Sequence, residues 1–179
     1  MDFILLLTGI VQITMSLLIG VLLIYLASKL LQKLISGIDE IDELKRNNIA
    51  VAILNGSITF SLILVVKNSV ESAITIFSNT LRDPKAEFIS FLKTALIMLL
   101  HVLVAGIVAF TVISIALLIF VRLTKELDEL GQIKKNNVAV SILLGIIIIS
   151  MAMLLQPGII TVLDSLIPFP PVSLIDIGK

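Results

Sequence analysis

The stretch "RNNIAVAILNG", residues 46–56, recurs almost unchanged as "KNNVAVSILLG", residues 135–145. In both copies a basic residue and two asparagines lead into an apolar run that ends in glycine. The copies lie 89 positions apart without a gap, and charged residues upstream keep that register. The matched charged pairs are Asp39 and Asp128, Glu40 and Glu129, and Lys45 and Lys134. Chance similarity between apolar segments would not reproduce charges, so the sequence predicts one unit written twice.

The composition indicates a chain that belongs in a membrane. Hydrophobic residues make up 58% of it and charged residues 15%, whereas a soluble domain is about 45–50% apolar and about 25% charged. The predicted partner is therefore the lipid bilayer. The formal net charge is zero, which gives no reason to expect nucleic-acid binding. Cysteine is absent, which excludes disulfides and thiol catalysis.

Four apolar segments are long enough to cross a bilayer, which takes about 20 residues of helix. Backbone groups cannot stay unpaired in lipid, so these segments should be helices. The sequence thus predicts an all-α integral membrane protein with four transmembrane helices. Their approximate ranges are residues 3–27, 49–66, 94–121 and 138–155.

Each repeat is expected to contain two crossings followed by a short amphipathic helix at the membrane surface. The first repeat covers residues 1–89, with its surface helix at about 68–81. Asn68 and Glu71 have the spacing of a capping box at the start of that helix. The second repeat covers residues 90–179, with its surface helix at about 158–167 and a proline-rich, extended tail at 168–179.

The two repeats should point the same way, because each contains an even number of crossings. This predicts a parallel repeat about a pseudo-twofold axis along the membrane normal. The two repeated loops carry eight basic residues and the opposite side carries five. The positive-inside rule then favours cytoplasmic loops, with both termini outside the plasma membrane.

The asparagines precede apolar helices, where the first N–H groups lack intrahelical partners. Asn48 and Asn137 stand at the cap position, where an asparagine side chain accepts from such a group. An alternative is a ring of asparagines near the pseudo-axis that binds a ligand or an ion. That ring would also include Asn47 and Asn136, and capping alone does not explain why each site has two asparagines.

The acidic residues just before the asparagines alternate with apolar ones, which is typical of a short surface helix with a solvated face. Paired carboxylates could instead bind a divalent cation, although neighbouring basic residues offer them salt bridges. The residues concerned are Asp39, Glu40, Glu43, Asp128 and Glu129.

Small residues four apart let membrane helices approach closely. Ala52 and Gly56 have this spacing, as do their repeat partners Ser141 and Gly145. The pattern predicts that the second and fourth crossings meet through these faces, or that the faces pack against equivalent faces of a neighbouring subunit.

The other polar residues inside the crossings are few. His101, the one histidine, lies in the third crossing, where it makes an interhelical hydrogen bond or serves a proton- or ligand-linked role. Asn55 and nearby hydroxyls could line an aqueous cleft or bond to the third crossing. The sequence has no phosphate loop, nucleophile set or metal-spaced histidine pair, so we expect neither an enzyme nor a cofactor.

The motifs "DELKRNNIAVAILNG" and "DELGQIKKNNVAVSILLG" resemble those of the YjfL-like membrane proteins, domain of unknown function 350. In that family an acidic-to-basic loop ends in asparagine before small apolar residues and glycine, once in each half. The resemblance covers nearly the whole chain except its proline-rich end. It implies a four-helix membrane protein with its termini outside, and it implies no activity.

Two functions follow as hypotheses. The first is a non-enzymatic scaffold or envelope-maintenance component that forms a homo-oligomer through its small-residue faces, with room for an unidentified membrane-protein partner. The second is a channel or carrier for a small ion or solute, with the asparagine region or His101 on its path.

Overall fold

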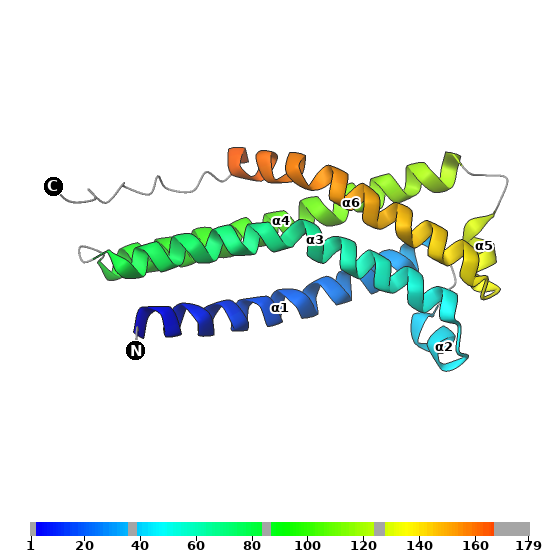
Figure 1. The fold of residues 1–179 in the computed structure, drawn as a ribbon, viewed down its shortest axis with the longest axis horizontal. Coiled ribbons are helices and arrows are strands. Elements are labelled where there is room, and N and C mark those ends of the chain that lie inside the picture. The colour runs from blue at the N-terminus through cyan, green and yellow to red at the C-terminus, as the bar shows by residue number, and fades with distance from the viewer. Residues whose placement is uncertain (1–2, 36–38, 84–86, 124–127, 167–179) are drawn as a thin grey trace.

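The computed structural model describes residues 3–35, 39–83, 87–123 and 128–166, and in these ranges the chain forms six helices (Figure 1). Four are long and two have six residues each. In chain order they are α1 (Phe3–Leu34), α2 (Glu40–Lys45), α3 (Ile49–Arg82), α4 (Phe88–Leu123), α5 (Glu129–Lys134) and α6 (Val138–Leu166).

The four long helices are each long and apolar enough to cross a membrane. The short helices α2 and α5 lie at the same end of the molecule (Figure 1). α1 and α4 run toward that end, and α3 and α6 run away from it. The described residues therefore form an all-helical membrane protein with four membrane-length helices, as the sequence predicts.

Helix α3 occupies the centre of the molecule, where it packs against α1, α4 and α6. Its buried face is mostly apolar, and seven of its residues have no exposed surface: Ala50, Val51, Leu54, Ile58, Ser61, Leu62 and Val65. In a membrane, contacts of this kind stabilise the helix bundle by close packing rather than by exclusion of water. The core of the protein is thus built around one helix.

The prediction of a separate surface helix at residues 68–81 is wrong, because α3 continues through this segment to Arg82. No proline interrupts it, and Asn68, predicted to start a new helix, lies within it. The Lys67 ammonium is 3.5 Å from the Glu71 carboxylate, one helical turn away. Ala73 and Ile74 are buried, so the amphipathic segment covers the bundle as an extension of the crossing.

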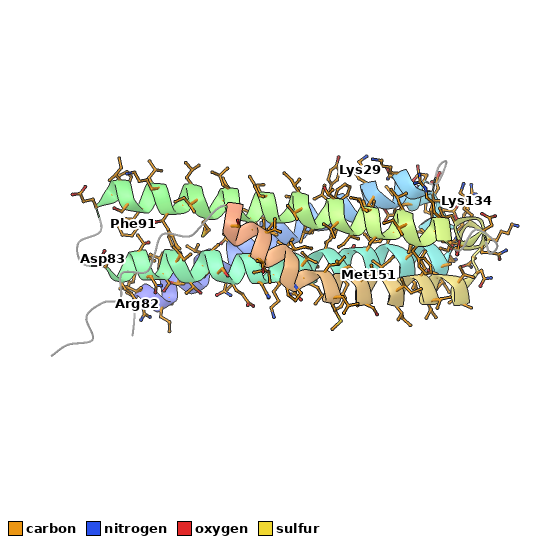
Figure 2. The ribbon with its side chains drawn as sticks, turned by 90° about the horizontal axis from the view of Figure 1, so that it is seen from above. Lys29, Arg82, Asp83, Phe91, Lys134 and Met151 are labelled. Carbon is orange, nitrogen blue, oxygen red and sulfur yellow. The ribbon has the colours of Figure 1, made fainter. Side chains whose placement is uncertain are left out.

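The predicted break between the fourth crossing and a surface helix at 158–167 is also wrong. α6 continues to Leu166 with Pro157 inside it, although proline has no N–H to give to the preceding turn. The Thr161 hydroxyl donates to the Pro157 carbonyl at 3.0 Å, and Figure 2 shows that α6 changes direction beyond Met151. The predicted tail at 168–179 lies outside the described residues.

The first and third crossings are longer than predicted. α1 extends beyond residue 27 to Leu34, and α4 begins at Phe88 rather than near residue 94. Both extensions continue the apolar pattern: Leu30 and Leu31 of α1 are buried in the core, whereas Phe88, Ile89 and Leu92 of α4 are exposed.

Candidate functional site

The first asparagine of each pair ends a short helix. Asn47 follows α2 with a φ of 57°, in the left-handed region that asparagine tolerates better than most residues. The Asn47 N–H donates to the Leu44 carbonyl at 3.0 Å, and the Asn48 N–H donates to the Glu43 carbonyl at 2.9 Å. This is the Schellman arrangement, which satisfies carbonyls that the end of a helix leaves unpaired.

The same arrangement ends α5. Asn136 has a φ of 60°, its N–H donates to the Ile133 carbonyl at 3.0 Å, and the Asn137 N–H donates to the Gln132 carbonyl at 3.0 Å. Each pair of asparagines therefore has two structural roles. The first asparagine adopts the left-handed conformation that ends one helix, and the second caps the helix that follows.

The second asparagine of each pair caps a long helix, as the sequence predicts. The Asn48 side-chain oxygen accepts from the Val51 N–H at 3.1 Å. The Asn137 side-chain oxygen accepts from the Val140 N–H at 3.4 Å. No observation tests the alternative of an asparagine ring that binds a ligand or an ion, and it stays a hypothesis.

The two turns also bind each other. The Asn136 side-chain oxygen accepts from the Ala50 N–H at 3.0 Å, so an asparagine of the second turn satisfies a free N–H at the start of α3. In return the Asn48 amide donates to the Ile133 and Lys134 carbonyls at 3.3 Å each, at the end of α5. The Asn48 amide also lies 2.7 Å from the Glu43 carboxylate. The α3 start and the α5 end are therefore clasped together.

This clasp runs in one direction only, which corrects the predicted pseudo-twofold relation. A twofold axis would repeat each contact, with Asn47 accepting from the Ala139 N–H and Asn137 donating to the Leu44 carbonyl. Within the described ranges neither bond is present. Asn47, Leu44 and Ala139 are exposed instead. The two repeats therefore meet through different surfaces, in the manner of a heterologous contact.

The small residues of the two repeats also differ in their burial. Ser141 and Gly145 are buried against α3: the Ser141 hydroxyl donates to the Ala50 carbonyl, and a Cβ added at Gly145 would overlap the Ser57 hydroxyl. Ala52 and Gly56 are exposed. The prediction that the second and fourth crossings meet through both small faces is therefore wrong for α3, which presents a different face to α6.

Two acidic residues of the short helices are buried, which corrects the prediction of a solvated face. Glu40 is 9% exposed and Glu129 is 4% exposed. The Asn55 amide donates to the Glu40 carboxylate, so Asn55 binds α2 rather than the third crossing. In the described part of the chain one Glu129 oxygen has no hydrogen-bond partner, because the residue that corresponds to Asn55 is Leu144.

Two other acidic residues at this end, Asp39 and Asp42, have local partners. The Asp39 side chain caps α2 by accepting from the Ile41 N–H at 3.0 Å, and Asp42 lies 3.5 Å from Lys45. Asp128 is exposed. Among the residues that the structure describes, no three His, Cys, Asp or Glu side chains converge as they would around a metal ion.

An open groove of about 440 Å³ runs along the exposed side of α3. Ala52, Gly56 and Ile63 form its apolar floor, and the Glu40–Asn55 pair lies at the end nearest α2. The groove thus places a hydrogen-bonded polar pair beside a stripe of small residues on the outside of a membrane-length helix. His101, by contrast, is buried on α4 and is 1% exposed.

Sequence reasoning missed the Glu40–Asn55 pair and the Asn136–Ala50 clasp. The first joins residues 15 positions apart and the second residues 86 apart, so no helical or turn spacing connects them. The sequence contained one signal for the Glu40–Asn55 pair. Asn55 corresponds to Leu144, so the two matching stretches differ at that position.

Four membrane-length helices around an apolar core, with short helices and asparagine turns gathered at one end, define a polytopic α-helical membrane protein. A family model described as Domain of Unknown Function (DUF350) matches residues 5–159 and also residues 91–177. The chain belongs to this family, as its motifs indicate. No curated protein and no solved structure matches it.

Proposed function

We propose that this protein is a non-enzymatic membrane component that self-associates in the bilayer and acts as a scaffold or in maintenance of the cell envelope. The observation that carries the proposal is the groove on α3. The Glu40–Asn55 pair lines its end nearest α2, and an ionisable residue beside lipid is costly even when it is paired. A protein neighbour over the groove removes that cost.

The shape of the groove supports a protein neighbour. Its floor is made of Ala52 and Gly56, and nothing lies within 4 Å of a Cβ added at Gly56. Small residues at this spacing allow a second helix to approach closely and gain van der Waals contact. A second copy of this chain fits this role, and a different membrane protein would use the same surface.

The test is the mass of the purified protein in mild detergent, measured by light scattering or native mass spectrometry over a range of concentrations. We expect an oligomer. A monomer at every concentration, with no cross-linked species in native membranes, would contradict self-association.

A channel or carrier for a small ion or solute is the second candidate. The Glu40–Asn55 pair favours it, because an oligomer could bring several such pairs around a common path. Purified protein in liposomes would then show flux that Asn48→Leu or His101→Leu abolishes. We expect tight vesicles, since the centre of α3 is packed with fully buried apolar side chains such as Leu54 and Ile58.

We propose further that α2 and α5 face the cytoplasm of a plasma-membrane protein whose two repeats insert the same way up. The excess of basic residues in these loops supports this orientation. The chain has no cysteine, so a single Lys135→Cys variant can be labelled with a membrane-impermeant maleimide. We expect labelling only after the cells are opened. Labelling of intact cells would contradict the orientation.

A further inference from the structure

Over their first halves, up to Val65 on α3 and Leu154 on α6, many corresponding positions of the two helices differ in burial. On α3, four of the residues that have no exposed surface are Ala50, Leu54, Ser61 and Val65. The residues 89 positions later on α6 are all exposed: Ala139, Leu143, Ser150 and Leu154. We call the first set the α3 inner face and the second set, with Ile146 between its members, the α6 outer face.

The reverse holds for the small-residue faces. On α6, Ser141, Gly145, Ile148 and Ala152 are buried. The corresponding residues of α3 are Ala52, Gly56, Thr59 and Ile63, and all four line the open groove. The open groove on α3 thus corresponds to the small-residue face of α6, and within the chain α3 covers that face of α6.

What covers the small-residue face of α6 is the α3 inner face. The Ser141 hydroxyl donates to the Ala50 carbonyl, and Gly145 closely approaches Ser57. The asparagine turn completes the contact, because Asn136 accepts from the Ala50 N–H. The contact therefore joins an inner face of one helix to a small-residue groove of the other.

The two surfaces that stay exposed, the α3 groove and the α6 outer face, correspond to the two surfaces that meet within the chain. Ala139, Leu143 and Ser150 of the α6 outer face repeat the residue types of Ala50, Leu54 and Ser61. Leu143 is 53% exposed. The Asn47 side chain, which corresponds to Asn136, is also exposed. Each chain thus presents one complete groove and one complete inner-type face, on different helices.

We propose that a second copy of this chain places its α6 outer face in the α3 groove of the first, which repeats the contact made within each chain. This proposal rests on the self-association proposed above and adds its geometry. The copies lie the same way up in the membrane, and Asn47 of one copy accepts from the Ala139 N–H of the next. Such head-to-tail contacts build a ring if the rotation closes and an open row if it does not.

The contact predicts which residues touch between copies. Within the chain, Ser57 meets Gly145, so between copies Ile146 of one chain meets Gly56 of the next. The double variant Gly56→Cys/Ile146→Cys, oxidised with copper phenanthroline in native membranes, should give disulfide-linked dimers and higher species on a non-reducing gel. A control pair, Gly56→Cys/Ile115→Cys, uses an exposed position on α4 and should give at least about tenfold less.

A symmetric interface would give a different pattern. If equal faces meet, the single variant Gly56→Cys cross-links to itself as well as the double variant does, and the head-to-tail contact is overturned while self-association stands. If the protein is an oligomer but neither variant cross-links, the contact is likewise overturned. If the protein is a monomer throughout, the proposed function fails with it.

A second measurement does not depend on cysteines. Gly56→Leu fills the open groove, and nothing lies within 4 Å of a Cβ added at Gly56, so the monomer should fold and the oligomer should weaken by about tenfold or more. Asn47→Gly keeps the left-handed turn and should also weaken the oligomer. If both variants leave the oligomer unchanged at every concentration, the groove is not the interface.

Discussion

At the scale of the residue, the four asparagines make different contacts, although the two stretches that contain them match in sequence. Asn48 is 4% exposed, and its side chain bonds to Val51, Glu43, Ile133 and Lys134. Among the described residues, the Asn137 side chain bonds within its own repeat, to Gln132 and Val140. The difference arises because the second repeat packs over the start of α3, whereas no described residue packs in the same way over the start of α6.

Replacing these two caps should therefore have unequal effects. Asn137→Ala should cost about 1 kcal/mol, the typical value of a cap. Asn48→Ala should cost about 2–4 kcal/mol, because it also removes the side-chain bonds to the end of α5 and to the Glu43 carboxylate. Unfolding of the two variants in mixed micelles against a denaturing detergent would measure the difference. Equal losses would contradict the clasp between the turns.

The Glu40–Asn55 pair gives a second prediction at this scale. Asn55→Leu places in the first repeat the residue found in the second, and it leaves the buried Glu40 carboxyl without its amide donor. We expect a loss of about 1–3 kcal/mol. In a Glu40→Gln background the same substitution should cost less, and a double-mutant cycle in the same unfolding assay would measure the coupling. Zero coupling would show that the pair does not stabilise the fold.

At the scale of the element, α3 and α6 show how similar helices acquire different surroundings. Both begin with an asparagine cap, and both continue well beyond the length of one crossing. α3 lies among three long helices, whereas α6 packs against α3, α4 and the short helix α5. The glycine of each helix therefore sits in a different place: Gly145 at a helix contact, and Gly56 at an open groove.

The two glycines should differ in their tolerance of a methyl group. Gly145→Ala places a carbon against the Ser57 side chain and should destabilise the fold by about 1–3 kcal/mol. Gly56→Ala meets nothing and should be neutral or slightly stabilising, since alanine favours helix over glycine. Ser57→Gly should restore tolerance at position 145. A Gly145→Ala penalty that Ser57→Gly does not relieve would contradict the close approach.

At the scale of the whole molecule, the bundle is organised around α3 and is open on its outer sides. Apolar side chains cover much of α1 and α6 on the exposed surface, as lipid-facing helices require. The polar ends of the short helices gather at one end, where the asparagine turns join the two repeats (Figure 2). The interior of the bundle is therefore closely packed, whereas the two repeats present different outer surfaces.

Matched leucines test this arrangement. Leu54 has no exposed surface and Leu143, its repeat counterpart, is 53% exposed. In the monomer, Leu54→Ala should cost about 2–5 kcal/mol because it leaves a cavity, and Leu143→Ala should change stability by less than about 0.5 kcal/mol. Similar losses in the detergent unfolding assay would show that the two helices are packed alike.

Much of the fold could be predicted from the sequence. The length of the apolar segments predicts four crossings, and the position of Asn48 and Asn137 predicts where two of them begin. These signals are local, because a helix and its cap are made by residues within a few turns of one another. The breaks predicted near Asn68 and Pro157 were wrong, since contacts with neighbouring helices outweigh a weak capping pattern and a single proline.

The sequence by itself therefore determined the class of protein and its four membrane-length helices, and it showed two matching stretches 89 positions apart. Only the tertiary structure decided which faces of the repeated helices are buried, why each turn needs two asparagines, and that Glu40 pairs with Asn55. The physical reason is that equal sequences do not have equal neighbours. Packing depends on residues far apart in the chain. In one molecule the inner face of α3 is covered by the second repeat, whereas the corresponding outer face of α6 is exposed.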